Sequence, residues 1–592
     1  MPAVYLGRLV LRWCDECNLP VLHEKCGICS SSTREVKHTP PGDVRPAFSN
    51  ELEFARKIID EHFGHGCGIK LLPPEKVVVL NKVPHVDRMD EYIVDGHVLF
   101  SIRFDPCRGF APVLKCEGAI RLGSVITKKF VVVDAGVVNS LKGGYNVMIP
   151  GVIDADDDIK SGDEVVVLCN DRIVAVGTAR VDGKSMKSGG RGIAVKIRFF
   201  CGEDKRHVLH GGQTWNDVIN ANKHVIDSIV SDAIAFIQDV AKRFDLPIAL
   251  SYSGGKDSLA TLLLMLDAGI KPTIIFADTG LEFPETLENV REVAKKYGLP
   301  LIIQDAGDGF ERGLALFGPP AKNYRWCCKT CKLGPTTLLI EKYFPGGVLT
   351  FIGQRRYESE QRAKKGSVWR NPWVKKQIGV SPIQNWTAMH VWLYIFMKKA
   401  PYNKLYELGL DRIGCYLCPA ADLAEFEFHK YRKYEDWVSY LREWAKKHGL
   451  GENWAECGGW RVKKEKRGDN RLRIIRASEK LDGVHGVFNK ELDLQRVAVG
   501  LRIFGPVRIA QDRVMSEACT VWGNGRIVAR KDTFQQSVSA VIRAMECVGC
   551  GVCVGYCPSG AIKIVENKFV VDEDKCTGCL ECLKVCTVLS FR

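Results

Sequence analysis

The chain has 592 residues, of which 46% are hydrophobic and 26% are charged, and its formal net charge is +14. This length excludes a single hydrophobic core, because such cores stop growing at roughly 250–300 residues. The composition excludes a disordered or fibrous protein, and no apolar run approaches the ~20 residues of a membrane span. The positive charge favours polyanionic partners. The first residues lack the features of a secretory signal, so we expect a cytoplasmic protein.

Most of the 24 cysteines stand in pairs separated by two residues. This is the spacing of metal ligands rather than of a disulfide scaffold. Near the N-terminus, two such pairs bring four soft thiolates within reach of one ion, which predicts a structural zinc site. The ligands would be Cys14, Cys17, Cys26 and Cys29. We assign residues 1–45 to a zinc ribbon.

Residues 46–125 predict a small α+β domain, with a helix over 51–63 and strands over 76–80 and 97–103. No motif in this segment indicates a catalytic, ligand-binding or metal-binding site. Cys67, Cys107 and Cys116 lack paired spacing, so we expect them to be small buried hydrophobic side chains.

Residues 126–202 contain short β-type runs separated by turn residues. The run over 144–151, followed by Gly162 and Asp163, resembles the PUA domain, a compact β-barrel of RNA-modifying enzymes. The resemblance implies that a glycine-rich turn and the adjoining strands contact RNA. The residues at these positions are Lys142, Gly143, Gly144 and Arg191. A barrel kept only for architecture is the alternative.

An apolar β-type run over 247–253 leads directly into a glycine loop, and helical character continues over 259–265. Adjacent glycines let backbone N–H groups surround phosphate oxygens, and a helix N-terminus adds its positive end. The loop lacks the spacer of a Walker A motif. It resembles instead the PP-loop of adenine-nucleotide α-hydrolase-like proteins. The predicted nucleotide contacts are Ser253, Gly254, Gly255, Lys256, Asp257 and Ser258.

Strands and helices alternate after this loop, with apolar runs over 273–277, 301–304 and 348–352, which predicts a doubly wound parallel sheet. Ligands of such sheets lie at the carboxyl ends of the strands. Asp278 and Glu282 follow one strand end and are candidates to hold ribose or magnesium, although isolated acids more often cap helices. The strand predicted over 348–352 is followed by three arginines. They could bind phosphate or sulfate through bidentate hydrogen bonds, or they could lie on a solvent-exposed face of a helix. They are Arg355, Arg356 and Arg362.

Over residues 240–460 the chain resembles the phosphoadenylyl-sulfate (PAPS) and adenylyl-sulfate (APS) reductase family. The motifs that carry the resemblance are Ser253-Gly-Gly-Lys-Asp-Ser258, Asp278-Thr-Gly-Leu-Glu-Phe-Pro-Glu-Thr286, Trp326-Cys327-Cys328, Ser381-Pro-Ile-Gln-Asn-Trp386 and Ile413-Gly-Cys415-Tyr-Leu-Cys418. In APS-type members, a Cys-Cys pair and a later C-x2-C hold one 4Fe–4S cluster. The resemblance implies that the corresponding ligands are Cys327, Cys328, Cys415 and Cys418. Cys331 is an extra thiol that could replace a ligand or carry sulfur.

Reductases of this family keep a nucleophilic cysteine in a Glu-Cys-Gly motif, and Glu456-Cys457-Gly458 is similar to it. The resemblance implies that the thiolate of Cys457 attacks sulfur and forms an enzyme-bound thiosulfonate, which reduction releases as sulfite. The motif departs from the family pattern because it is internal and lacks the histidine that usually follows.

Two runs with the spacing C-x2-C-x2-C-x3-C occur in residues 541–592, as in two-cluster bacterial ferredoxins. The fourth cysteine of each run ligates the other cluster. One 4Fe–4S cluster is therefore expected on Cys547, Cys550, Cys553 and Cys586. The second is expected on Cys576, Cys579, Cys582 and Cys557. We assign residues 203–460 to the PP-loop domain and 461–540 to a small connecting domain.

Two functions fit this multidomain α/β chain. In the first, PAPS or APS is reduced to sulfite, and the ferredoxin domain passes on electrons from an external donor. In the second, ATP with magnesium adenylates an RNA, such as a tRNA, docked by the PUA domain. Sulfur from a thiol or persulfide on Cys331 or Cys457, or from a cluster-bound sulfide, then replaces AMP. The fused ferredoxin favours the reductase, whereas the complete Lys256-Asp257 loop favours thiolation. A non-catalytic RNA-binding scaffold leaves that loop without a role. We expect a reductase whose catalytic residues are Cys457, Lys256 and Cys331.

Overall fold

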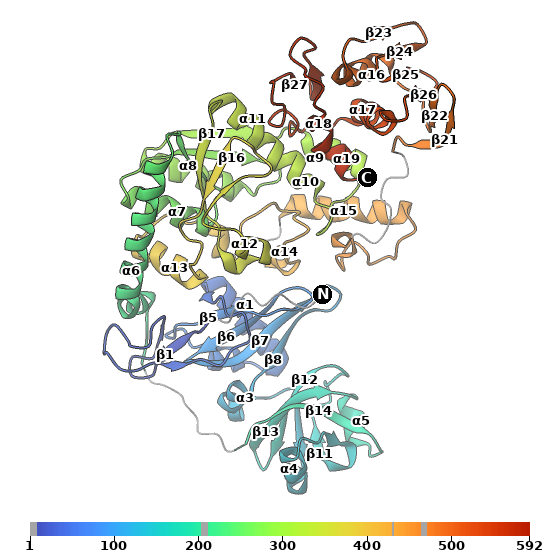
Figure 1. Cartoon of the computed structure of the whole chain (residues 1–592). Helices are drawn as coiled ribbons and strands as arrows, with labels where there is room; N and C mark the ends of the chain where they lie inside the picture. The colour runs from blue at the N-terminus through green and yellow to red at the C-terminus, as the bar shows by residue number, and fades with distance from the viewer. Residues whose placement is uncertain (1–8, 203–210, 429–430, 463–470) are drawn as a thin grey trace.

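The computed structural model describes residues 9–202, 211–428, 431–462 and 471–592. Figure 1 shows a parallel sheet with its helices at the centre, the sheet of residues 130–200 at the lower end, and the last modules, in red, at the upper end. Within the described part of the chain, every helix is too short or too polar to span a bilayer.

Two small antiparallel sheets form the N-terminal modules. The first has the strand order β2-β1-β3, with β1 (Arg12–Cys14), β2 (Leu19–Val21) and β3 (Arg34–Glu35). The second has the order β4-β5-β6-β7-β8, with β4 (Arg45–Pro46), β5 (Val79–Lys82), β6 (Met89–Val94), β7 (His97–Asp105) and β8 (Gly109–Leu114). Its helices are α1 (Ser49–Phe63), α2 (Cys67–Leu71) and α3 (Cys116–Leu122). The helix predicted over 51–63 and the strand over 97–103 are confirmed as α1 and β7.

The third module is a six-stranded sheet with the order β10-β14-β13-β12-β9-β11. Its pairings are antiparallel except for β9 with β12. The strands are β9 (Phe130–Val133), β10 (Val147–Met148), β11 (Val152–Ala155), β12 (Glu164–Cys169), β13 (Arg172–Ala179) and β14 (Ile193–Phe200). The helices are α4 (Ala135–Lys142) and α5 (Gly183–Lys187).

The central sheet has the order β17-β16-β15-β18-β20-β19, and its pairings are parallel except for β19 with β20. Its strands are β15 (Ile248–Ser251), β16 (Thr273–Asp278), β17 (Leu301–Asp305), β18 (Val348–Ile352), β19 (Val368–Arg370) and β20 (Gln377–Val380). The main helices are α6 (Trp215–Arg243), α7 (Lys256–Asp267), α8 (Pro284–Tyr297), α9 (Gly309–Phe317), α11 (Gly334–Tyr343), α13 (Ala388–Met397) and α15 (Arg432–Lys447). Four short helical segments complete this domain: α10 (Trp326–Cys328), the π-helical turn η3 (Lys329–Leu333), α12 (Glu360–Ala363) and α14 (Ala424–Phe428).

Both faces of the central sheet are covered by helices. Successive strand residues point to opposite faces, so Ala249 packs in a core with α11 whereas Leu250 packs in a core with α7, α8 and α13. In the next strand, Ile275 packs in the core with α11, and Ile274 packs in the core with α7, α8 and α13. The predicted doubly wound sheet is therefore confirmed.

The C-terminal part contains an antiparallel sheet and the cysteine-rich module. The sheet has the order β21-β22-β26-β25-β24-β23, with β21 (Ile474–Lys480), β22 (Gly483–Phe488), β23 (Arg508–Ile509), β24 (Arg513–Met515), β25 (Cys519–Trp522) and β26 (Arg526–Ala529). Its helices are α16 (Leu494–Leu501) and α17 (Phe534–Glu546). The cysteine-rich module has the hairpin β27 (Ile562–Val565) and β28 (Lys568–Val571), with α18 (Glu581–Lys584) and α19 (Thr587–Ser590).

A buried carboxylate fixes the second module on the central domain. The oxygens of Asp87 accept the backbone N–H groups of Leu423 and Ala424, each over 3.0 Å, and pair with the guanidinium of Arg461. Both charged side chains are buried. Because a buried charge without its partner is strongly destabilising, this pair holds the second module and the 419–424 segment together.

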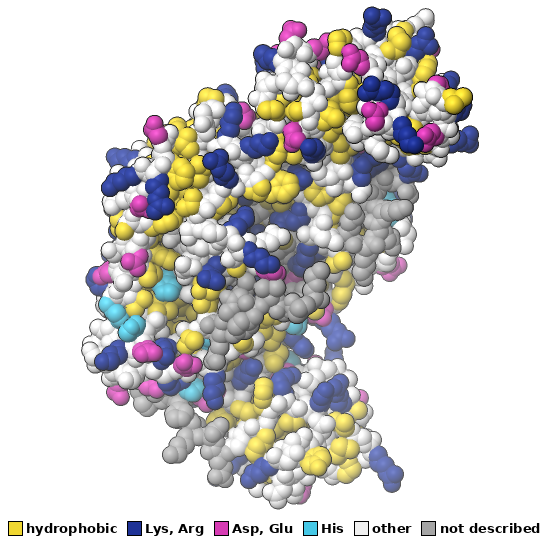
Figure 2. All heavy atoms as spheres, in the orientation of Figure 1, with side chains coloured by type: hydrophobic (Ala, Val, Ile, Leu, Met, Phe, Trp, Pro, Cys, Tyr) yellow, Lys and Arg dark blue, Asp and Glu magenta, His cyan; other side chains and the backbone are white. Residues whose placement is uncertain are grey.

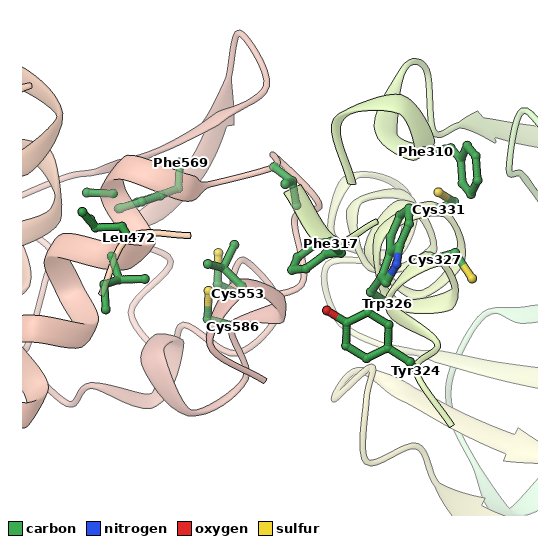
Figure 3. Close-up of a cluster of buried hydrophobic side chains, with 14 of the residues drawn as sticks. Phe310, Phe317, Tyr324, Trp326, Cys327, Cys331, Leu472, Cys553, Phe569 and Cys586 are labelled. Carbon is green, nitrogen blue, oxygen red and sulfur yellow. The ribbon is translucent and has the colours of Figure 1, made fainter. Parts of the chain in front are cut away.

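One hydrophobic core joins the central domain to the C-terminal modules. It includes Phe317 and Trp326 from the central domain together with Leu472, Phe569 and Cys586. Figure 3 shows Phe317 between the cysteines of the two parts. The backbones also approach closely, because a Cβ at Gly334, the first residue of α11, would stand 1.7 Å from the carbonyl oxygen of Cys550.

We therefore expect Gly334→Ala to weaken the contact between the central domain and the cysteine-rich module. The clash should cost about 1–3 kcal/mol, although alanine is the better helix former by about 1 kcal/mol. Thermal unfolding and limited proteolysis of the full chain measure the effect. The matched control is Gly346→Ala, where an added Cβ meets open space. Equal stability of the two variants would contradict the prediction.

Candidate functional site

The glycine loop at residues 253–258, which is predicted to bind phosphate and is called the phosphate loop below, connects β15 to the first turn of α7. The predicted strand, glycine turn and helix are therefore confirmed. Gly255 is the N-cap of α7. Gly254 has a φ of 72°, and a Cβ there would stand 2.8 Å from Cγ2 of Thr286. Both the left-handed backbone and the packing therefore require glycine at 254. The exposed Ser253 has its Oγ 3.3 Å from Oγ of Ser258.

Neighbouring side chains hold the charged residues of the loop. Nζ of Lys256 lies 3.1 Å from Oδ2 of Asp257, and the backbone N–H of Lys256 donates to the Tyr406 hydroxyl over 2.8 Å. Burial opposes the charge on Asp257, but Arg355 and Lys256 outweigh burial and lower the pKa of this carboxyl. Asp257 therefore remains a carboxylate beside the loop. No motif pointed to Tyr406.

The three predicted anion-binding arginines lie after β18, and two of them are paired. Arg355 is buried, and its guanidinium donates to Asp257 over 2.6 Å and to Asp43 over 2.8 Å. Arg362 pairs with Glu358. The guanidinium of Arg355 therefore helps to fix Asp257 of the phosphate loop. Binding of an anion by the three arginines stays a prediction.

The two acids predicted to hold ribose or magnesium have different environments. Oδ1 of Asp278 accepts the backbone N–H of Gly280 over 2.9 Å. Glu282 accepts a hydrogen bond from Thr279 over 2.9 Å, and burial raises the pKa of its carboxyl. A raised pKa weakens magnesium binding at this carboxyl, because magnesium binds the carboxylate form. Arg356 lies with its guanidinium over the ring of the next residue.

A cavity of about 140 Å³ connects the phosphate loop to a group of thiols. Ser253 and Glu282 belong to its lining. The cysteines in the lining are Cys327, Cys328, Cys331, Cys415 and Cys418. They come from α10, η3 and the loop that precedes α14. The structure thus brings Ser253, the first residue of the predicted nucleotide loop, to the same cavity as the predicted cluster ligands, whereas residues 254–258 and the three predicted arginines are not among its lining residues. The segment η3 is a π-turn, a kind often found at functional sites.

The chemistry of these thiols fits a cluster better than a single ion. Among the described residues, no three of the predicted ligands lie within 4.8 Å of one another, whereas the four N-terminal zinc candidates do. The hydrogen bond from Cys327 lowers the pKa of Cys328 to about 5 despite burial, and Arg325, whose Nη2 lies 3.2 Å from that Sγ, adds to this effect. Oγ1 of Thr279 lies 3.6 Å from Sγ of Cys415. Thiolate is the form that ligates iron.

The C-terminal cysteines approach one another across the two runs. Cys586 interacts electrostatically with Cys550 and Cys553, and Cys582 does so with Cys553 and Cys557. Cysteines of the two runs therefore lie close together, which the exchange of fourth cysteines requires. The donor set is all thiolate, which suits two 4Fe–4S clusters, although the ligand assignment stays a prediction.

A buried arginine lies between these cysteines. Arg543 is 1% exposed, its Nη1 lies 3.2 Å from Sγ of Cys582, and its charge also interacts with Cys553 and Cys586. The guanidinium stands 3.7 Å from the ring centroid of Phe569, and its Nη2 lacks a hydrogen-bond partner within the described chain. A buried cation needs compensating charge. Cluster thiolates would provide it, so the surroundings fit the expected cofactors.

The N-terminal thiols fit a zinc ion. The four Sγ atoms that lie within 4.8 Å of one another belong to Cys14, Cys17, Cys26 and Cys29. The group packs on α6, where the backbone N–H of Gly27 donates to the carbonyl of Ala221 over 2.9 Å and that of Leu22 donates to Asn222 over 2.7 Å. An ion here would therefore fix the first module on the central domain.

The residues predicted to contact RNA lie along one edge of the third module. Lys142 ends α4 and is followed by Gly143 and by Gly144, which has a φ of 83°. Arg191 precedes β14, which pairs with β10, and Lys142 and Arg191 are both exposed. Tyr145 is 70% exposed at the same edge. Exposed basic and aromatic side chains together are typical of RNA-binding surfaces.

The structure pairs cysteines that the sequence left unpaired. Sγ of Cys457 is bonded to Sγ of Cys107, and Cys116 is bonded to Cys201. The expectation of small buried hydrophobic side chains is wrong for Cys107 and Cys116, because both form disulfides and Cys107 is exposed. It is confirmed for Cys67, which is fully buried. Cys457 is not among the residues that line the cavity, and its role as nucleophile stays a prediction.

Three family models match the chain. The model described as the phosphoadenosine phosphosulfate reductase domain matches residues 247–421. The PUA domain matches residues 129–201, and the 4Fe–4S dicluster domain matches residues 546–589. The matched segments contain the parallel sheet, the third module and the cysteine-rich module respectively.

Similar proteins cover most of the chain. An uncharacterized protein of Methanocaldococcus jannaschii is 41% identical over 476 residues, which are 78% of this chain and 97% of that protein. Adenosine 5′-phosphosulfate reductase 2 of Bacillus subtilis is 30% identical over 209 residues, which are 35% of this chain and 85% of that protein. A crystal structure of PAPS reductase from Candida auris, with phosphate, is 21% identical, covers 35% of this chain and 98% of its own, and has a TM-score of 0.27.

We expect Cys26→Ser to remove zinc from the purified chain, because three thiolates do not complete a tetrahedral structural site. Loss of the ion should also lower the thermal midpoint of unfolding, since the site packs on α6. Metal analysis measures the zinc content. The control Cys169→Ser changes a buried cysteine outside this group and should keep the metal. Full zinc content in Cys26→Ser would exclude the assignment.

We expect Cys328→Ser to lower the iron content by about one third, because one of three equal clusters loses a ligand. Cys331→Ser is the matched control, because it removes a neighbouring thiol of the same cavity and should leave iron unchanged. Iron analysis and electron paramagnetic resonance of the reduced chains distinguish the two. If Cys331→Ser loses the iron instead, Cys331 is the ligand.

Proposed function

Because the chain belongs to the phosphoadenosine phosphosulfate reductase family, we propose that it reduces PAPS or APS to sulfite with electrons that pass through its C-terminal module. The observation that carries this proposal is the cavity in which Ser253 of the phosphate loop shares the lining with five cysteines. A phosphate loop alone would serve many reactions, whereas thiols beside it favour sulfur chemistry.

The phosphate loop binds the nucleotide part of the substrate. Backbone N–H groups at the start of α7 other than that of Lys256, which is bonded to Tyr406, donate to phosphate oxygens together with the Ser253 hydroxyl. The side chain of Lys256 adds a positive charge. Arg355 acts through Asp257, which it holds in place at the start of α7. Glu282 lines the same cavity, and burial raises the pKa of its carboxyl, which lessens its repulsion of a sulfate oxygen.

Cys457 is the nucleophile in this proposal. Its thiolate forms a bond with the sulfate sulfur, the bond between sulfur and the phosphate oxygen breaks, and the nucleotide leaves as AMP or its 3′-phosphate. The product is a thiosulfonate on Cys457. Cys331 is buried, and burial raises the pKa of its thiol to about 12. Because the nucleophilic form of cysteine is the thiolate, a neutral Cys331 thiol is a poor nucleophile. We therefore place Cys331 beside the cluster and assign the attack on sulfur to Cys457.

The packing supports electron flow within the chain. Bound 4Fe–4S clusters supply electrons one at a time. Figure 3 shows Phe317, Tyr324 and Trp326 between the cysteines of the C-terminal module and those of the cavity. The Tyr324 hydroxyl donates to the carbonyl of Phe591 over 3.1 Å. All these residues except Phe591 belong to the buried part of one core, so protein rather than solvent fills the space between the two sets of thiols.

The second candidate function is ATP-dependent thiolation of RNA. The observation that favours it is the exposure of Tyr145, Lys142 and Arg191 in the third module. The positive charge is not confined to these residues, because Figure 2 shows Lys and Arg side chains spread over the whole visible face. RNA is therefore a proposed partner of the third module, and reduction of adenylated sulfate remains the first proposal.

Anaerobic assays separate the two functions. The reconstituted chain, given reduced viologen as electron donor, should produce sulfite from PAPS or APS, and RNA should not change the rate. Pyrophosphate release from ATP that depends on added RNA would favour thiolation and would reject the reductase. The nucleotide that gives the higher kcat/KM identifies the substrate.

We expect Lys256→Ala to reduce kcat/KM for sulfite formation roughly ten- to hundred-fold, because a charge-assisted hydrogen bond to phosphate is lost. The control Lys364→Ala removes an exposed lysine paired with Glu360 and should leave this rate unchanged. Sulfite formation by Lys256→Ala at the wild-type kcat/KM would contradict this role of Lys256.

A further inference from the structure

We propose that Cys107 is the resolving cysteine of the reaction: its thiolate displaces sulfite from Cys457 and leaves the Cys107–Cys457 disulfide. The inference rests on the proposed function, because it requires a thiosulfonate on Cys457. The observation behind it is the bond between these two cysteines, which are 350 residues apart in sequence and have their Cα atoms 5.2 Å apart.

Both cysteines of this disulfide lie in loops at the surface. Cys107 is exposed in the turn between β7 and β8, where its backbone N–H donates to Oδ1 of Asp105 over 2.8 Å. Cys457 is half-buried in the loop between α15 and the short helix η6 (Gly459–Arg461). Exposed disulfides are the ones that exchange readily with other thiols. A bond in this position suits a catalytic cycle.

The other disulfide of the chain has the features of a structural bond. Cys116 begins α3 and Cys201 lies just after β14, so the bond ties the second module to the third. Cys201 is 2% exposed and belongs to a hydrophobic core. Burial protects such a bond from attack by thiols. The Cys116–Cys201 pair is therefore an internal control for the Cys107–Cys457 pair.

The framework of the protein fixes both loops on the segment that follows the cluster candidate Cys418. Nε of Arg461, four residues after Cys457, donates to the carbonyl of Pro419 over 3.1 Å, and Pro419 lines the cavity. The module that carries Cys107 reaches the same segment through Asp87, which accepts the N–H of Leu423. The two thiols are thus held near each other whether or not the bond between them is formed.

The exchange step balances in atoms and electrons. The Cys107 thiolate forms a bond with Sγ of Cys457, and the bond from that Sγ to the sulfonate sulfur breaks. The electron pair of the broken bond leaves with the sulfite. The two thiols have then given two electrons to sulfur and become one disulfide. Two electrons and two protons from the reductant of the proposed function restore the thiols for the next cycle.

A single turnover of the full chain tests this step. The protein is reduced, freed of reductant under anaerobic conditions and mixed with sulfur-radiolabelled PAPS or APS. The wild-type chain should release sulfite, and peptide mass analysis should find the Cys107–Cys457 disulfide. Cys107→Ser should release the nucleotide product normally but keep the label on Cys457. Its sulfite release should fall roughly a hundred-fold or more until dithiothreitol is added.

Three further variants make the outcome decisive. Cys107→Ala should repeat the result of Cys107→Ser, and normal nucleotide release in either variant shows that it is folded. Cys116→Ser should release sulfite as the wild type does, and Cys457→Ser should bind no label. Sulfite release at the wild-type rate from Cys107→Ser without added thiol overturns the inference. If even the wild-type chain forms neither label nor nucleotide product, the proposed reductase function itself is rejected.

Discussion

A buried guanidinium, that of Arg355, connects the phosphate loop to the N-terminal modules. It donates to Asp257 in the loop and to Asp43 in the segment after the zinc candidates. The other oxygen of Asp43 accepts the backbone N–H of Ala388 at the start of α13, over 2.6 Å. If one partner of such a buried set is lost, a charge remains uncompensated at a cost of several kcal/mol. The loop therefore keeps its shape only while the N-terminal segment stays docked on the central sheet.

The modules depend on one another in the same way elsewhere in the chain. The pair of Asp87 with Arg461 fixes the second module on the segment after Cys418, and a single core continues from Trp326 into the cysteine-rich module. Gly334 allows the backbone of Cys550 to approach α11 without a side chain between them. The second module, the central domain and the C-terminal modules are thus packed into one structure rather than joined as independent domains.

The sequence predicted those structural features that depend on residues close together in the chain. The strand, glycine turn and helix around Gly254 and the doubly wound sheet could be predicted, because hydrophobic period and glycine position are local properties. The zinc ribbon, the domain boundaries and the cytoplasmic location stay predictions. The contact of Tyr406 with the loop, the pairing of Asp43 with Arg355 and the bond of Cys107 to Cys457 could not be predicted. They join residues more than a hundred positions apart, and spacing carries no information over that range.

The position of Arg543 has a consequence for the biogenesis of the protein. Its guanidinium is enclosed among Cys553, Cys582 and Cys586 and stacked on Phe569. In a newly synthesised chain without iron, those thiols are largely neutral, and a buried cation would face them without counter-charge. We therefore expect helix α17 to reach its final packing as iron and sulfide are inserted. Cluster insertion and closure of the C-terminal core would then be a single maturation event.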